Sequence, residues 1–210
     1  MKKILTIIVF VTSWIYANAQ VPYDSIDIKK DNSYQYICQF TSSAKDKYEV
    51  ATNWLDSSIN EYERTIISEN KRSFKVKFKP EIMYEQSDAQ SLHLVATITL
   101  ECHDDKILVR FTDIKRKSIT PNCNFLTPAS EIYKKRNYNA NQEMQNFSHY
   151  KELSVKKRLT SEESSKLNNL KHYKGMTKEM IMKKEMKPYI DLQKAIASLI
   201  NGIEKAIKGE

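Results

Sequence analysis

Glycine and proline are scarce in this chain: 3 glycines and 5 prolines occur among 210 residues. So little of either residue excludes a flexible linker and a repeat array. The first glycine is Gly175, so no Gly-rich loop able to cradle a phosphate precedes it. The chain is long enough for one domain with a real core.

Cysteine and histidine patterns are equally sparse. The three cysteines, Cys38, Cys102 and Cys123, match no zinc spacing and include no Cys-x-x-Cys pair. Cys38 and Cys102 lie in apolar strand patterns and are predicted to be buried small hydrophobes, although one disulfide in an oxidising compartment remains an alternative. No nucleophile elbow, His-Glu-x-x-His or paired-carboxylate motif is present, and the histidines have no partner at ligand spacing. The sequence therefore favours a protein that is not an enzyme, with no cofactor and no catalytic residue.

Only one long apolar run occurs, and it lies at the start of the chain. Lys2 and Lys3 precede an apolar stretch over residues 4–16, and Ala17-Asn18-Ala19 supplies small residues before Gln20. This order predicts a Sec-type signal peptide over 1–19. No cysteine marks a lipoprotein cleavage site, and no other run is long enough to span a membrane. We expect an exported protein of a Gram-negative envelope, periplasmic or extracellular.

Charge is unevenly distributed along the chain. The net charge of +8 falls to +6 without Lys2 and Lys3, and residues 114–187 hold 17 basic and 7 acidic side chains. A basic surface attracts anionic lipids, glycans or other polyanions. The alternative is a solvated, poorly packed segment. Tyrosines at 133, 138, 150 and 173 lie among the basic runs and could stack on sugars. The predicted anionic-surface residues are Lys115, Arg116, Lys117, Lys134, Lys135, Arg136, Lys156, Lys157 and Arg158.

Residues 34–117 have the periodicity of a strand, a helix and four further strands. Alternating apolar residues predict strands at 34–40, 64–69, 74–79, 92–102 and 107–111, and residues 82–84 are ambiguous. A helical stripe that includes Leu55, widened by Val50 and Trp54, predicts a helix over 42–59. This order predicts an α+β fold with an antiparallel sheet of about five strands and the first helix on one face.

The flanking segments complete the predicted organisation. Residues 20–33 are polar and indicate a leader, 120–128 indicate a loop, and 118–187 indicate a basic, partly helical and lightly buried insert. Thr160 and Glu163 form a capping-box signal for a short helix, and Thr177 can cap a second one ending near Lys187. Pro188 then suits the first turn of a closing helix over 188–208. Its apolar stripe predicts packing on the same sheet face as the first helix.

One cluster has the residue types of a metal or acid–base site. Glu101, His103, Asp104 and Asp105 surround a predicted hairpin turn and are weak candidates for holding a hard cation. Turns use polar residues for their own geometry, so a structural turn is the favoured interpretation.

Three segments within residues 34–117 carry a resemblance to a known family: Ser43 to Leu55, Leu94 to Cys102 with Asp104-Asp105-Lys106, and Val109 to Ile114. They resemble an exported bacterial family, domain of unknown function 4468, which has the fold of one half of the TATA-box-binding protein saddle. The resemblance implies a TBP-like fold with a single repeat and no established activity. It does not imply DNA binding, because the DNA-gripping saddle needs two repeats and export separates the protein from the genome.

Together these patterns favour a non-enzymatic binding or interaction module of a bacterial envelope. Two alternatives remain open. One is a hydrolase with a dispersed site between sheet and insert. The other is a structural assembly subunit that uses the uncovered sheet face, where Lys75, Lys77, Thr97 and Thr99 are expected to point.

Overall fold

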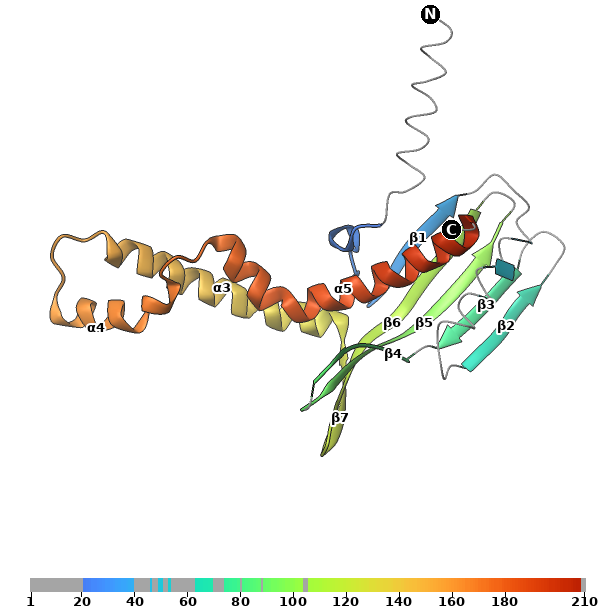
Figure 1. The fold of residues 1–210 in the computed structure, drawn as a ribbon, viewed down its shortest axis with the longest axis horizontal. Coiled ribbons are helices and arrows are strands. Elements are labelled where there is room, and N and C mark those ends of the chain that lie inside the picture. The colour runs from blue at the N-terminus through green and yellow to red at the C-terminus, as the bar shows by residue number, and fades with distance from the viewer. Residues whose placement is uncertain are drawn as a thin grey trace, which may run out of the picture.

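The structure is a computed structural model that describes residues 21–39, 46, 49–50, 53, 63–69, 74–79, 81–87, 89–103 and 106–208. For residues 63–69, 74–79, 102, 207 and 208 it describes the backbone alone. Among the described residues, the strands lie between residues 34 and 128 and the long helices between residues 129 and 208 (Figure 1). The α+β class and the antiparallel sheet predicted from the sequence are confirmed.

Seven strands form one antiparallel sheet. Its main path has the order β1-β6-β5-β3-β2, while β4 pairs with the first half of β5 and β7 pairs with the end of β6. The upper part of the sheet is therefore β1-β6-β5-β3-β2, and the lower part is β4-β5-β6-β7. The strands are β1 (Tyr34–Gln39), β2 (Glu63–Glu69), β3 (Phe74–Lys79), β4 (Glu81–Gln86), β5 (Ser91–Cys102), β6 (Lys106–Thr120) and β7 (Cys123–Pro128).

Strand β6 is longer than the sequence predicted, and β7 replaces the predicted loop at 120–128. Asp113 has a positive φ of 55°, and the β5–β6 register shifts between Val95 and Thr97. A bulge of this kind inserts one residue, so the apolar alternation changes phase between Phe111 and Ile114. Because of this change of phase, the strand predicted from the alternation stops at residue 111, before β6 ends. Beyond it, β6 continues to Thr120 and turns back as β7.

The helices are α3 (Ala129–Ser154), α4 (Ser161–Asn169) and α5 (Lys178–Lys208), with short 3-10 turns η1 (Tyr23–Ser25) and η2 (Lys171–Tyr173). The capping box at Thr160 and Glu163 is confirmed, and Thr177 accepts a hydrogen bond from the Met180 N–H. The predicted division at Pro188 is wrong, because α5 runs through it as one helix. Proline lacks an N–H and costs a helix several kcal/mol. Packing on both sides, at Ile181 and Tyr189, offsets that loss.

The main core lies between the sheet and the second half of α5. Leu94, Ile98 and Phe111 from the sheet and Leu192 and Ile196 from α5 are all fully buried in one cluster. The stripe predicted for the last helix is confirmed through Ile203, because its residues follow a spacing of about 3.6 and face the sheet. Within the described residues, no helix is long and apolar enough to cross a bilayer.

The two predictions for the N-terminal part of the body have different outcomes. The expected leader over 20–33 instead supplies Ile26 and Ile28 to the main core. In the expected helix over 42–59, Asp46, Glu49 and Asn53 are helical and exposed as predicted, whereas Val50, placed on the apolar side, is 38% exposed. Leu55 and Trp54 lie outside the described residues, so the packing of this helix stays a prediction.

The strand register separates the cysteines. Cys38 and Cys102 are both Cα partners of Ile107, from opposite sides of β6. Two strand spacings amount to roughly 10 Å, whereas bridged cysteines have Cα atoms about 4.4–6.8 Å apart. Cys123 lies at the opposite end of β6, as the partner of Thr120. The register therefore excludes a disulfide between Cys38 and Cys102, and Cys38 is buried as predicted.

Candidate functional site

A helical arm extends from the sheet. It consists of α3, α4, η2 and the first part of α5, residues 129–187, and Figure 1 shows α3 and α5 side by side with α4 at the far end. The 26 residues of α3 correspond to a length of roughly 39 Å. Phe147, Tyr173 and Ile181 form a small core inside the arm. The predicted lightly buried insert is thus an ordered hairpin of helices with its own core.

The three predicted basic runs do not gather in one patch. Lys115, Arg116 and Lys117 lie on β6, the second run lies near the start of α3, and the third lies in the turn between α3 and α4. Arg136 and Lys156 are 20 residues apart, which corresponds to roughly 30 Å along a helix. A single anionic ligand cannot contact all nine residues, so they divide into a sheet group and an arm group.

The sheet group is engaged with the protein itself. Lys115 Nζ lies 2.9 Å from Asp113, and Lys117 Nζ lies 2.7 Å from Glu81 Oε2. The Nε atom of Arg116 is buried and has no hydrogen-bond partner among the described residues. These three residues are therefore poorly placed for a surface ligand.

The tip of the arm combines an exposed apolar side chain with exposed basic side chains. Val155 is 79% exposed and is followed by exposed Lys156, Lys157 and Arg158. Lys156 pairs with Glu163 at 2.8 Å, and the hydrogen bond to Glu163 raises the pKa of Lys156. Among the described residues, no carboxylate lies within ion-pair distance of Lys157 or Arg158. The tip thus presents two uncompensated cations next to an apolar side chain.

The other predicted basic residues and tyrosines of the arm differ in how exposed they are. Lys134 and Lys135 are exposed and Arg136 is half-buried, on the first part of α3. Of the tyrosines expected to interleave with cations, Tyr138 is 64% exposed and Tyr133 is 45% exposed. Tyr173 is instead buried, and its hydroxyl donates a hydrogen bond to Glu143. Burial, followed by that hydrogen bond, raises the pKa of Tyr173 to about 12. Tyr173 therefore serves the arm core and not a ligand.

The candidate metal residues are only partly described. His103 Nε2 lies 3.6 Å from Glu101 Oε1, while Asp104 and Asp105 lie outside the described residues. Among the described residues no group of three His, Cys, Asp or Glu side chains has a metal-binding arrangement.

The lower part of the sheet holds a polar network that sequence reasoning missed. Ser91 Oγ lies 2.9 Å from His93 Nε2, and His93 Nδ1 lies 3.3 Å from Glu81 Oε1. Lys117 Nζ donates to both oxygens of Glu81, at 2.8 and 2.7 Å. The residues come from β4, β5 and β6, so only strand pairing brings them together. No local motif marks them in the sequence.

Two hollows line α5. One, of about 530 Å³, lies between β4 and α5 and is bordered by Tyr84, Lys187 and Asp191. The buried Tyr84 hydroxyl has no partner among the described residues. Burial raises the pKa of Tyr84 to about 12, against a smaller lowering by Arg116, so the phenol stays protonated near neutral pH.

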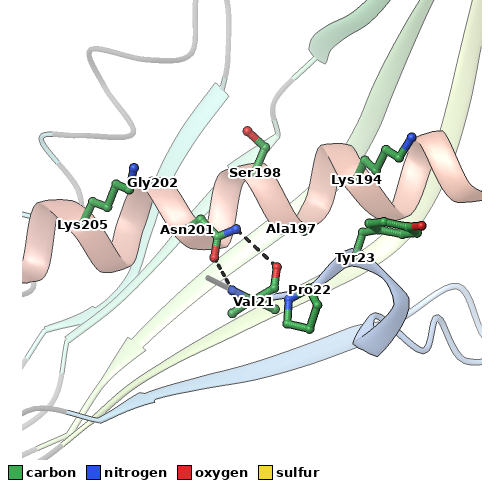
Figure 2. A pocket seen from close by; sticks show the side chains of 9 residues that line it. All are labelled: Val21, Pro22, Tyr23, Lys194, Ala197, Ser198, Asn201, Gly202 and Lys205. Atoms are coloured by element: carbon green, nitrogen blue, oxygen red, sulfur yellow. Dashed lines mark hydrogen bonds between the residues drawn. The ribbon is translucent and has the colours of Figure 1, made fainter. Parts of the chain in front are cut away.

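The other hollow, of about 670 Å³, is an open groove between α5 and Val21, Pro22 and Tyr23 (Figure 2). The Val21 N–H donates to Asn201 Oδ1 at 2.7 Å, and Asn201 Nδ2 donates to the Val21 carbonyl at 3.3 Å. Lys194 lies over the Tyr23 ring, 5.4 Å from its centre. Because its polar groups bond the two sides together, this groove is a structural seam.

Comparisons with known proteins give two likenesses to solved structures, both of low similarity. No family model matches the sequence, and no curated protein matches it. A crystal structure of a TBP-like protein from Parabacteroides distasonis matches with a TM-score of 0.39 at 11% identity, over 49% of this chain and 68% of that chain. A DUF4468 family protein from Bacteroides ovatus matches with a TM-score of 0.37 at 15% identity, over 53% of this chain and 68% of that chain. These are the two kinds of protein that the sequence resemblance named, and neither name states an activity.

Proposed function

We propose that this protein is an exported interaction module that uses its helical arm to contact an anionic envelope surface. One observation carries the proposal: the arm extends beyond the sheet and ends in exposed Val155 beside exposed Lys157 and Arg158. A cation near an anionic bilayer surface contributes about 1 kcal/mol. An exposed apolar side chain at the same tip adds contact area with the interface.

The composition of the arm supports the same function. Residues 129–187 hold 14 basic and 7 acidic side chains. Exposed cations continue along its outer surface at Lys171, Lys174 and Lys178. By contrast, residues 21–128, which include the strands of the sheet, hold 15 basic and 16 acidic side chains. An anionic surface would therefore attract the arm and not the sheet, which orients the molecule with its arm toward that surface.

Co-sedimentation with vesicles tests the proposal. The purified chain is mixed with vesicles of phosphatidylglycerol and phosphatidylcholine, and with phosphatidylcholine alone as the neutral control. We expect binding to the anionic vesicles that falls steeply as salt rises, because exposed charges are screened within about 10 Å at 0.1 M. The double variant Lys157→Ala/Arg158→Ala should bind roughly 30-fold more weakly, from about 1 kcal/mol per cation.

The matched control removes two adjacent exposed lysines from the body, as Lys29→Ala/Lys30→Ala. It has the same net charge as the arm variant, and we expect its affinity to change less than about twofold. Equal loss in both variants would show that net charge alone drives binding and would contradict a role for the arm. Binding that is absent, or that does not respond to salt, would also contradict the proposal.

A further inference from the structure

The open face of the lower sheet carries a serine, a histidine and a carboxylate linked in series. This face is opposite α5, because Leu92 and Leu94 on β5 are buried in the core while Ser91 and His93 alternate with them. We propose that Ser91, His93 and Glu81 form a nucleophilic serine site that reacts with carboxylic esters. The site lies on the sheet and does not rest on the function proposed for the arm.

Strand pairing holds the three groups in place. Ser91 and His93 are two residues apart on β5, so they share a face. Met83 of β4 and Lys117 of β6 are the Cα partners of His93 on its two sides. Glu81 is two residues before Met83 and therefore reaches the same face. A site built on three neighbouring strands is held more firmly than one built on loops.

The hydrogen bonds assign a role to each residue. His93 Nδ1 faces Glu81 Oε1 at 3.3 Å, so we assign the ring proton to Nδ1 and make Nε2, 2.9 Å from Ser91 Oγ, the acceptor for the Ser91 hydroxyl. The Ser91–His93 distance is within the roughly 2.6–3.2 Å expected of a nucleophile and its base, and the His93–Glu81 distance is just above that range. Lys117 contacts both oxygens of Glu81 and keeps the carboxylate turned toward the ring. Ser91 and His93 are the catalytic residues, and Glu81 and Lys117 are positioning residues.

The reaction follows from these roles. Ser91 Oγ attacks the ester carbonyl carbon while His93 Nε2 accepts the hydroxyl proton. The bond between the carbonyl carbon and the alkoxy oxygen breaks, and His93 returns the proton to the leaving alcohol. Water then attacks the acyl carbon while His93 Nε2 accepts its proton, the bond between the acyl carbon and Ser91 Oγ breaks, and His93 returns the proton to Ser91 Oγ. The products are a carboxylic acid, the alcohol and unchanged Ser91, so no other reactant is needed.

Neighbouring side chains select an apolar acyl group. Met83, His93, Lys117 and Leu126 occupy one row across four strands. Directly opposed residues share a face, so Met83 and Leu126 flank the polar network. They are 52% and 58% exposed. An apolar acyl chain lying along this row would bury them, and an open face admits an ester that is carried on a larger molecule.

The site lacks one part of an efficient hydrolase. Ser91 is paired with Gln86 of β4 and with Ile119 of β6, so the sheet ladder, and not an oxyanion hole, engages the backbone N–H groups beside it. Loss of one oxyanion-hole donor costs hydrolases about 10²–10³ in rate. We therefore expect slow turnover and readily detected acylation or phosphonylation of Ser91 by activated reagents.

Labelling with a fluorophosphonate probe and hydrolysis of p-nitrophenyl butyrate test the inference. Peptide mass spectrometry of the purified chain should place the phosphonyl group on Ser91, and Ser91→Ala should lose it. His93→Gln should lower the labelling rate at least about 100-fold, because a general base contributes 10²–10⁴. Glu81→Gln should lower the rate by about tenfold without a matching loss of melting temperature.

Ser87→Ala is the matched control. Ser87 lies four residues before Ser91, in the turn between β4 and β5, but its hydroxyl donates to the Gln90 carbonyl at 3.1 Å and not to an imidazole. Its substitution should leave labelling and hydrolysis unchanged. Absence of label on Ser91 in folded protein would overturn the inference. An unchanged labelling rate in folded His93→Gln would do the same, because it would show that the network is structural only.

Discussion

The sheet body and the helical arm are held together by different kinds of packing. In the body, strands from the first half of the chain and α5 from the end share one continuous core that includes Leu94, Ile98, Phe111 and Ile196. In the arm, a pair of helices is joined by a cluster of Phe147, Tyr173 and Ile181 with a few half-buried neighbours. The comparison indicates that the body is stabilised by long-range packing, whereas most of the arm surface faces outward. The arm is therefore longer than its small core alone would require, and most of its length presents side chains to the outside.

The largest effect is expected from a core deletion in the body. Phe111 is fully buried and packs between the strands and α5. Phe111→Ala should cost about 3–5 kcal/mol of global unfolding free energy, because the lost ring leaves a cavity. Urea unfolding followed by circular dichroism measures this cost. A cost below about 1 kcal/mol would contradict the shared core.

The same substitution in the arm should give a smaller and local effect. Phe147 is 5% exposed and contacts the Tyr173 ring edge-on, with 5.9 Å between ring centres. Phe147→Ala should lower the free energy of local opening of the arm by up to about 3 kcal/mol. Hydrogen exchange should then quicken in α3 and α4 and stay unchanged in β5 and β6. Faster exchange in the sheet as well would show that body and arm unfold as one unit.

The N-terminal seam should contribute less again. Asn201→Ala removes both hydrogen bonds to Val21, so we expect a loss of about 1–2 kcal/mol. Ser198→Ala, one turn earlier on the same wall of the groove, is the control and should stay within about 0.5 kcal/mol of the parent. Urea unfolding compares the two. Equal stability of both variants would show that the segment from Val21 is not held by Asn201.

The smallest effect on stability near neutral pH is expected from two buried tyrosine phenols, whose ionisation matters only above pH 10. The pKa values of Tyr84 in the body and Tyr173 in the arm are raised from 10.0 to about 12, chiefly by burial. The folded state therefore favours the neutral phenol. This stabilisation is complete below pH 10 and disappears as the pH rises from 10 toward 12.

Unfolding curves at pH 9 and pH 11.5 check the sign of this effect. The parent chain should lose stability across the window, and Tyr84→Phe should lose less because its ring cannot ionise. Tyr173→Phe should reduce the alkaline opening of the arm in particular. A parent chain that gains stability above pH 10 would contradict both assignments.

Some of these features could be predicted because they are local. The alternation in β5 and the stripe along α5 place apolar residues at the periods of a strand and a helix, and both faces are buried as predicted. The capping box at Thr160 needs only residues three apart. By contrast, the end of β6 was not predicted, because the apolar alternation changes phase at Asp113. The prediction that a helix starts at Pro188 is wrong, because tertiary packing allows α5 to continue through it.

The candidate sites were harder to predict for the same reason. Lys157 and Arg158 were identified from charge alone, but only the α3–α5 hairpin places them at a projecting tip. Glu81 and Ser91 were not selected at all, since their relation to His93 depends on the β4–β5 pairing. Ile26 and Ile28 lie in a polar stretch whose isolated apolar residues have no periodicity. Their burial could not be predicted from the sequence, because it depends on packing with α5 in the main core.

The sequence by itself determined which faces of the strands and of α5 are apolar, because burial of apolar surface follows the periodicity of the side chains. Tertiary structure alone decided the pairing of α3 with α5, the entry of residues 21–28 into the core and the alignment of Ser91, His93 and Glu81. The first two features depend on contacts between segments far apart along the chain, and the third depends on the register in which β4 pairs with β5. Local periodicity contains no information about which segments meet or in which register.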